Sequence, residues 1–210
     1  MRERGMIFNA EMVRAILNGS KTQTRRVFKK QPDEDGVSCQ EGSWFDSSET
    51  RHDNPFGKVG DRIWVRETYR VMGCATDVAR LMYKASERNS FTESTRTVPV
   101  GTCTKQPSQN WTPSIHMPRW ASRILLEITN VRVERLNAIS EEDAKAEGVT
   151  PAGTLLPEHP GTYLTPNGDF ATAEVAFQRL WESIYGEEGW QSNPWVWVIE
   201  FKRVEVGNEQ

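Results

Sequence analysis

The chain has 210 residues, of which 37% are hydrophobic and 26% are charged, and its formal net charge at pH 7 is -3. This balance is typical of a chain that buries a core, and it excludes an intrinsically disordered protein. The first apolar run, residues 6–8, is too short for a signal peptide, and no stretch is long enough to cross a bilayer. We therefore expect a soluble, cytoplasmic protein that has no membrane partner.

The charges are strongly segregated along the chain. Residues 1–30 hold eight lysines and arginines against two acids, whereas residues 31–54 hold seven acids against Arg51 alone. Residues 136–188 are again acidic, with ten acids against two basic residues. Any single charge run is most simply a solvated surface. The asymmetry as a whole indicates one electropositive face that suits a local anionic ligand better than a long nucleic acid, so no DNA partner is expected.

The cysteines and histidines show no pattern of a metal site. Cys39, Cys74 and Cys103 are widely spaced and odd in number, which fits reduced thiols better than a disulfide framework. Together with the three histidines, they provide no pair at the close spacing of zinc ligands. We expect no metal and no cofactor.

The first predicted helix lies between Asn9 and Gly19. Asn9 can cap its N-terminus, apolar residues at positions 12, 13, 16 and 17 share one face, and Gly19 is a natural stop. The sequence that follows, residues 18–27, is NGSKTQTRRV and contains no acid; we name it the cationic stretch. We expect it in a loop or at the start of a strand, where its side chains can converge on a ligand.

Between the cationic stretch and residue 107, one strand has a clear signal. Residues 31–57 are acidic and rich in Gly, Ser and Asp, so we expect an excursion or loop. Residues 60–67, GDRIWVRE, predict a turn into a strand, because Ile63 and Val65 alternate with the residues around them. A weaker strand is predicted at residues 80–86, and residues 86–107 give no strong signal.

The clearest strand signal lies at residues 122–136. Apolar residues at 124, 126 and 128 alternate on one face, and those at 131 and 133 continue out of phase, which predicts a bulge or bend near Asn130. A short helix follows, with Ser140 as its N-cap, Asp143 at the capping-box position and Gly148 as its terminator. Glu147 lies at the end of this helix, where the helix dipole disfavours a carboxylate.

The remaining segments complete an α+β chain. Residues 150–168 are expected to form a loop, residues 172–186 an amphipathic helix and residues 194–204 a strand that is at first buried on both faces. We predict one domain over residues 1–210, a mixed or antiparallel β-barrel decorated by short helices. Bent strands that close on one another leave no long exposed edge.

Four segments, taken in order, carry a resemblance to a known family: NGSKTQTRR, GKVGDRIWVRE, SEEDAKAEGV and WVWVIEFKRV. Their succession resembles the ASCH-domain family, whose members adopt a PUA-like β-barrel and are linked to RNA and nucleoside metabolism. The resemblance runs from about residue 6 to residue 204, but compact members lack most of residues 28–56 and 68–119. These two predicted insertions make the chain similar to the longer, often phage- or prophage-associated branch.

The resemblance implies a set of catalytic residues. Some compact bacterial relatives are amidohydrolases that remove the acetyl group from N4-acetylcytidine with a lysine, a threonine and a glutamate. The matching positions in this chain are Lys21, Thr24 and Glu147, and Arg26 matches the arginine of the motif. Arg25 departs from the family pattern, in which a β-branched residue can stand, and it adds charge beside the implied site.

These residues also suit the chemistry of amide hydrolysis without the resemblance. The reaction needs a nucleophile, a base and an acid that protonates the departing amine. Thr24 could attack or position a water, and Lys21 could be the base if burial and neighbouring arginines lower its pKa, with Glu147 as the acid. The roles of Lys21 and Glu147 can be exchanged, because a close carboxylate favours a charged lysine that stabilises an oxyanion.

A second cluster of candidates lies at residues 110–123, NWTPSIHMPRWASR. Its tryptophans could stack on a base while an arginine holds a phosphate. Core packing explains the tryptophans equally well, and a structural role explains the histidine better than catalysis does. The predicted substrate-binding residues are Arg25, Arg26, Trp111, His116, Arg119, Trp120 and Arg123.

The sequence leaves two functional classes open. It contains no GxSxG, GxxxxGK[ST], GxGxxG or HExxH motif, which removes the commonest hydrolase, nucleotidase and dehydrogenase classes. One class is a metal-independent amidohydrolase acting on an N4-acylated cytidine or a similar modified nucleoside. The other is a PUA-like RNA- or nucleotide-binding protein, or a ribonuclease, that uses the same cationic residues. The expected partner is accordingly a modified nucleoside or a short RNA.

Overall fold

The computed structural model describes residues 1–204 and divides the chain into two compact units. Unit 1 comprises Met1–Leu17, Asp61–Glu127 and the end of the chain from Arg203, and unit 2 comprises Asn18–Gly60 and Ile128–Lys202. Helices occur together with mostly antiparallel sheets, which confirms the α+β class. In the described part of the chain, no helix is both long and apolar enough to cross a membrane.

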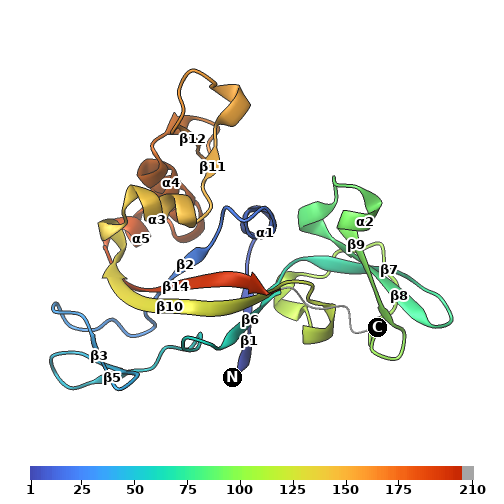
Figure 1. Cartoon of the computed structure of the whole chain (residues 1–210), viewed down its shortest axis with the longest axis horizontal. Helices are drawn as coiled ribbons and strands as arrows, with labels where there is room; N and C mark the ends of the chain where they lie inside the picture. Colours follow the sequence, from blue (N-terminus) through green and yellow to red (C-terminus); the bar gives the residue numbers. More distant parts are fainter. Residues whose placement is uncertain (205–210) are drawn as a thin grey trace. The chain divides into compact units, whose positions relative to one another are not determined.

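Unit 1 contains two groups of strands (Figure 1). Its elements are β1 (Glu3–Ile7), α1 (Ala10–Leu17), β6 (Arg62–Arg66), β7 (Tyr69–Cys74), β8 (Val78–Tyr83), η1 (Lys84–Ser86), α2 (Phe91–Ser94), β9 (Thr95–Pro99), η2 (Ser114–His116), η3 (Arg119–Ala121) and the beginning of β10 (Leu125–Arg135). In the first group, β6 pairs in parallel with β1 and antiparallel with β10. In the second group, β7, β8 and β9 form an antiparallel sheet.

Two elements of unit 1 follow directly from local sequence signals. Ile63 and Val65 are almost fully buried on β6, while the residues between them are half-buried, as the alternation of a strand requires. The predicted N-cap of α1 is present, because the Asn9 side chain accepts a hydrogen bond of 2.8 Å from the backbone nitrogen of Met12. Gly19 then adopts a φ of 83°, the left-handed conformation that ends many helices.

Unit 2 contains the longest helix of the described chain and the two long strands β10 and β14 (Figure 1). Its elements are β2 (Gln23–Val27), β3 (Ser38–Gln40), β4 (Ser43–Phe45), β5 (Arg51–His52), the rest of β10, η4 (Leu136–Ala138), α3 (Glu141–Ala146), β11 (Thr150–Pro151), η5 (Gly153–Leu155), β12 (Tyr163–Leu164), β13 (Phe170–Ala171), α4 (Ala173–Tyr185), α5 (Glu187–Gln191) and β14 (Trp195–Val204). The strand order here is β10, β14, β2, and β14 pairs antiparallel with β2.

An apolar core fixes α3 and α4 in unit 2. The buried stripe of α4 includes Ala176, Phe177 and Trp181, as its amphipathic pattern predicts. These residues share one cluster with Ala144 of α3 and Val196 of β14. Because α3 is held by this core, the polar side chains that it carries have a defined position.

The predicted barrel is not confirmed. Among the described residues, the strand pairings leave the sheets open rather than closing them. Each predicted insertion contains a small sheet of its own: β3, β4 and β5 lie within residues 28–56, and β7, β8 and β9 lie within residues 68–119. The loop predicted at residues 31–57 is therefore wrong in part, because strands of two or three residues are too short to show a hydrophobic period.

Other boundaries also differ from the sequence prediction. The strand predicted at residues 80–86 begins earlier, at Val78, and ends at Tyr83, where η1 takes over. Residues 86–107, which give no periodic signal, contain α2 and β9. The strand β10 runs through Asn130, and its residues change there from mainly buried to half-buried.

Removal of the α3 cap should destabilise the chain. The Ser140 hydroxyl accepts a hydrogen bond of 3.2 Å from the backbone nitrogen of Asp143. Ser140→Ala should lower the free energy of unfolding, measured by denaturant titration, by about 1 kcal/mol. Ser183→Ala, at an exposed position of α4, is the control and should change it by less than about 0.5 kcal/mol. Equal losses in the two variants would contradict a capping role.

Candidate functional site

The cationic stretch presents different side chains on the two faces of β2. Gln23 donates to the backbone carbonyl of Asp143 at 2.7 Å, and Arg25 donates to the Asp143 carboxylate at 2.8 Å. Both therefore lie on the face of β2 that meets α3. Because successive side chains of a strand point to opposite faces, Thr24 and Arg26 lie on the other face. Thr24 is buried there, with Ile199 of β14 as its partner in the strand pairing.

The carboxylates opposite β2 come from α3 and the residue that ends it. Asp143 and Glu147 are four residues apart, so they lie on the same face of the helix. Glu147 is the C-cap of α3, and Gly148 follows with a φ of 85°. The backbone of Glu147 also forms an isolated antiparallel bridge with Lys21. The unusual position of this glutamate at a helix end thus brings it beside a lysine.

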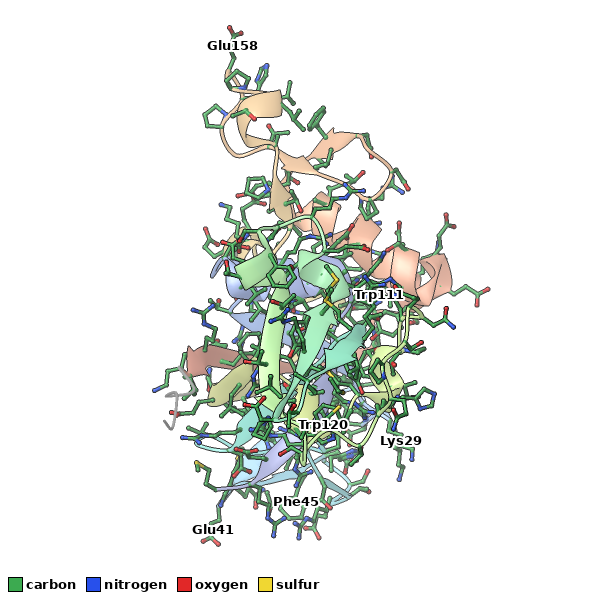
Figure 2. The ribbon with its side chains drawn as sticks, turned by 90° about the vertical axis from the view of Figure 1, so that its right-hand side faces the viewer. Lys29, Glu41, Phe45, Trp111, Trp120 and Glu158 are labelled. Carbon is green, nitrogen blue, oxygen red and sulfur yellow. The ribbon has the colours of Figure 1, made fainter. Side chains whose placement is uncertain are left out.

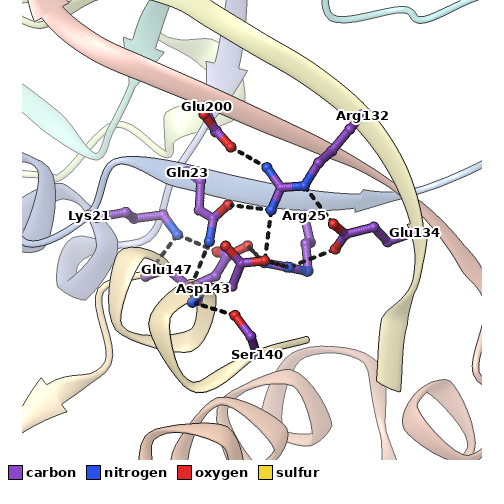
Figure 3. Close-up of polar contacts among 9 residues, drawn as sticks. All are labelled: Lys21, Gln23, Arg25, Arg132, Glu134, Ser140, Asp143, Glu147 and Glu200. Carbon is purple, nitrogen blue, oxygen red and sulfur yellow. Dashed lines mark hydrogen bonds and ion pairs between the residues drawn. The ribbon is translucent and has the colours of Figure 1, made fainter. Parts of the chain in front are cut away.

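Lys21 and Glu147 form a buried ion pair (Figure 3). The Nζ atom of Lys21 donates to Oε2 of Glu147 at 2.7 Å and to the Glu147 backbone carbonyl at 2.7 Å. The exposed fraction of the Lys21 side chain is 0%, and that of Glu147 is 3%. An ammonium has three N–H groups, so one donor of Lys21 is not used by these two bonds.

Burial gives Lys21 an altered acidity. Desolvation lowers the pKa of Lys21 below its ordinary value of 10.5, the charge and hydrogen bond of Glu147 oppose this effect, and the charges of Arg26 and Arg25 add to it. The net direction is downward because desolvation is the largest effect. Lys21 therefore releases its proton more readily than a surface lysine. Ionisable groups with such shifts are concentrated at functional sites, although structural ion-pair networks contain them too.

Arg25 joins the ion pair to further carboxylates. Its guanidinium contacts Oε1 of Glu147 at 3.2 Å, Asp143 at 2.8 Å and Glu134 of β10 at 3.0 Å. The Arg25 side chain has an exposed fraction of 0%, and the ring of Phe177 lies 5.9 Å from its central carbon. Its Nε atom is buried without a hydrogen-bond partner among the described residues. One N–H donor of this buried arginine is thus unsatisfied in the described residues.

Arg132 of β10 extends the network in the same unit (Figure 3). It contacts Asp143 at 2.7 Å and Glu134 at 2.5 Å, and it forms an ion pair with Glu200 of β14. It also donates to the side-chain oxygen of Gln23 at 3.3 Å. Four elements therefore contribute to one polar network, namely β2, β10, β14 and α3.

The network alters the acidity of Asp143. Burial would raise the pKa of this carboxyl, but the Gln23 amide and the guanidinium groups of Arg25 and Arg132 outweigh burial and lower the pKa below 3.8. The carboxylate form is stabilised because its hydrogen-bond donors are cations or lie next to them. Asp143 consequently acts as a fixed negative charge between two arginines.

The second predicted cluster lies in unit 1, and its two tryptophans do not form one wall. Figure 2 labels Trp111 and Trp120 and shows them well apart. Arg70 lies 4.8 Å and Lys84 5.0 Å from the ring centroid of half-buried Trp111. Trp120 is also half-buried and packs edge-on against Tyr69, with ring centroids 6.4 Å apart.

The arginines of this cluster already have acidic partners. Arg123 forms a two-pronged ion pair with Glu67, with N–O distances of 2.9 and 3.0 Å, and donates to the Ser86 hydroxyl at 2.9 Å. Arg119 is exposed and pairs with Glu3 at 2.8 Å. His116 is exposed at the end of η2. These residues belong to unit 1, whereas the Lys21 network belongs to unit 2.

Sequence reasoning missed most of the network. Lys21, Gln23 and Arg25 occur at every second position, which is the strand period, but only Lys21 and Arg25 were predicted for the site. Arg132 and Glu134 show the same spacing on β10. Asp143 was recognised only as a helix-capping residue. The members that the sequence did not assign to the site are Gln23, Arg132, Glu134, Asp143 and Glu200.

Comparison of the chain with family models, curated proteins and solved structures gave no match. The ASCH resemblance therefore depends on the four sequence segments alone. Within residues 1–204, no group of three or more His, Cys, Asp and Glu side chains is arranged to hold a metal ion. The chemistry of the candidate site must be argued from its own ion pairs and hydrogen bonds.

Loss of the Glu147 charge should be costly. Glu147→Gln leaves Lys21 enclosed without its carboxylate, and removal of one partner of a buried ion pair lowers the free energy of unfolding by about 3–5 kcal/mol. Glu142→Gln, on the same helix but exposed, is the matched control and should cost less than about 0.5 kcal/mol. Denaturant unfolding at neutral pH measures both. A loss for Glu147→Gln as small as the control's would mean that the pair is energetically unimportant.

The lowered pKa of Asp143 predicts a loss of stability in acid. A carboxylate whose pKa is lower in the folded chain stabilises it fully above the unfolded value of about 3.8, and this contribution disappears as pH falls through the lowered pKa. The difference in unfolding free energy between the wild type and Asp143→Asn should therefore shrink as pH falls from about 3.8 through the lowered pKa of Asp143. Unfolding titrations along a pH series measure it. A pH-independent difference would contradict the linkage.

Proposed function

We propose that the chain is a metal-independent amidohydrolase that acts on an N4-acylated cytidine or a similar modified nucleoside, on a PUA-like fold of the ASCH type. The observation that carries the proposal is the buried contact of 2.7 Å between Lys21 and Glu147. The resemblance assigns catalysis to these two residues, which are separated by 126 positions in the chain. Their direct contact supports a shared role in one reaction.

The roles follow from the hydrogen bonds of the pair. Lys21 donates to two oxygens of Glu147, which is the bonding of an ammonium beside a carboxylate. Glu147 is therefore proposed as the base that takes a proton from water, and the resulting hydroxide attacks the acyl carbon. The remaining N–H of Lys21 donates to the carbonyl oxygen as that oxygen becomes negative. Glu147 returns the proton to the exocyclic nitrogen when the C–N bond breaks, which yields the free nucleoside and a carboxylic acid, and the acid then loses its proton to water.

Arg25 has a positioning role in this scheme. It holds Oε1 of Glu147 at 3.2 Å, while Lys21 holds Oε2, so the carboxylate is fixed at both oxygens. Asp143 and Glu134 in turn hold Arg25. A residue whose geometry is fixed in this way needs little reorganisation during the reaction.

The alternative function, RNA or nucleotide binding, requires cationic side chains that can reach a phosphate. Lys21 and Arg25 are enclosed, with exposed side-chain fractions of 0%, and carboxylates already neutralise them. In unit 1, Glu67 holds Arg123 with two bonds. These contacts favour a small uncharged substrate over an RNA backbone or a ribonuclease reaction. The enclosure also means that substrate must displace part of the covering chain before it meets Lys21.

Acetate release from N4-acetylcytidine tests the proposal. The wild-type chain should hydrolyse this compound, and Lys21→Met should lower kcat/KM by about 10²–10³-fold, because it removes the donor to the oxyanion. Lys145→Met is the matched control: Lys145 lies on α3, 44% exposed, and its removal should leave the rate unchanged. Far-UV circular dichroism checks that each variant is folded.

A folded wild type that releases no acetate would refute the proposal. RNA binding would then be tested by its salt dependence, because several phosphate contacts make affinity fall steeply with added salt. Thr24→Ala belongs in the same assay, since Thr24 stays a prediction of the resemblance. The water mechanism does not use the face of β2 on which Thr24 lies, so acetate release should persist in Thr24→Ala. A loss equal to that of Lys21→Met would instead favour Thr24 as the nucleophile.

A further inference from the structure

The outer edge of β7 in unit 1 is covered by a later part of the chain. The backbone nitrogen of Ser108 donates to the carbonyl of Val71 at 2.9 Å. Tyr69 and Thr112 form an antiparallel bridge with hydrogen bonds of 3.2 and 2.7 Å. Residue numbers therefore rise along β7 while they fall along this returning segment, residues 103–112. The end of β7, at Cys74, consequently comes near the start of the returning segment, at Cys103.

Turn contacts bring the same two positions together independently. The turn after β7 is closed by a bond of 2.8 Å from the backbone nitrogen of Ala75 to the carbonyl of Val78. Val100, which directly follows β9, donates to the carbonyl of Asp77 in that turn at 2.8 Å. Cys103 donates from its backbone to Val100 at 3.1 Å. A short series of backbone bonds thus connects the turn that follows Cys74 to Cys103.

The environment of the thiols agrees with this placement. Desolvation, followed by the charge and hydrogen bond of the Cys103 thiol, raises the pKa of Cys74. Burial, followed by Cys103, raises the pKa of Tyr69 to about 12, so Cys103 also lies close to β7. Both cysteines are free; Cys74 is exposed and Cys103 is half-buried against the apolar cluster that contains Tyr69. An oxidant in solution can therefore reach Cys74 first.

We propose that Cys74 and Cys103 form a reversible disulfide that ties the end of β7 to the returning segment. The oxidant would be a small-molecule disulfide such as glutathione disulfide. The widely spaced cysteines of the sequence thus include one pair that the fold brings together, with Cys39 of unit 2 left outside it.

The reaction proceeds by thiol–disulfide exchange. The Cys74 thiolate attacks one sulfur of glutathione disulfide, an S–S bond forms between protein and glutathione, and one glutathione thiolate leaves. The Cys103 thiolate then attacks the Cys74 sulfur and displaces the second glutathione. The two protons of the protein thiols pass to the two glutathione thiolates, so the cysteine pair is oxidised and glutathione disulfide is reduced. A dithiol reductant reverses both steps.

Peptide mapping of the full wild-type chain tests the proposal without any substitution. The folded chain is incubated with glutathione disulfide, the remaining thiols are alkylated, and the peptides are identified by mass spectrometry. One cross-linked peptide pair should contain Cys74 and Cys103, and Cys39 should be recovered either alkylated or as a mixed disulfide with glutathione. A dithiol reductant should release the cross-linked pair. Full alkylation of Cys74 and Cys103 after oxidation would overturn the proposal, as would a cross-link that contains Cys39.

Single variants separate the intended pair from general reactivity. Cys39→Ser should form the cross-link as the wild type does, because Cys39 is not part of the pair. Cys74→Ser and Cys103→Ser should form no internal disulfide and should instead accumulate a mixed disulfide with glutathione on the remaining member of the pair. Hydrogen exchange of the returning segment should slow on oxidation of the wild type and stay unchanged in Cys103→Ser. If the backbone amides of the wild-type returning segment exchange as fast after oxidation as before it, the proposed disulfide does not constrain this segment.

Discussion

The enclosure of the Lys21 ammonium is the constraint on which the arrangement of unit 2 depends. A cation removed from water is costly unless a carboxylate and further hydrogen bonds replace its hydration. Glu147 supplies both a carboxylate oxygen and a backbone carbonyl, each at 2.7 Å. The loop before β2 and the end of α3 must therefore stay together for the charge to be tolerated. A catalytic role and a structural role for the pair are thus compatible, because the same fixed contact serves both.

The rest of the network follows from this one contact. Glu147 faces a second enclosed cation, Arg25, whose charge needs the additional carboxylates of Asp143 and Glu134. Those carboxylates in turn contact Arg132. Beside this polar network, the apolar cluster of α3, α4 and β14 holds the backbone in place. The apolar cluster positions α3. The enclosed cations Lys21 and Arg25 then require carboxylate side chains on the side of α3 that faces β2.

Elements with strong local signals could be predicted from the sequence. The Asn9 cap, the alternation around Ile63, the Ser140 cap and the apolar stripe of α4 each depend on neighbouring residues only, and the structure contains the corresponding elements. The short strands β3 to β5 depend on pairing between segments, which no local period reveals. Arg132 and Glu200 look like ordinary surface charges in the sequence, because their ion pair joins residues far apart along the chain. The resemblance implied a role for Lys21 and Glu147, but it did not indicate that Gln23 and Asp143 contact the same group of side chains.

The distances along the chain within this network have a consequence for folding. Lys21 lies near the beginning of unit 2, Asp143 and Glu147 lie far beyond it, and Glu200 belongs to the last strand. Contacts of such large sequence separation form late, because the entropy of closing long loops must be overcome first. During synthesis, the cationic stretch leaves the ribosome long before any of its carboxylate partners. The nascent chain therefore carries Lys21 and Arg25 without these carboxylate partners until β10 and α3 have been made.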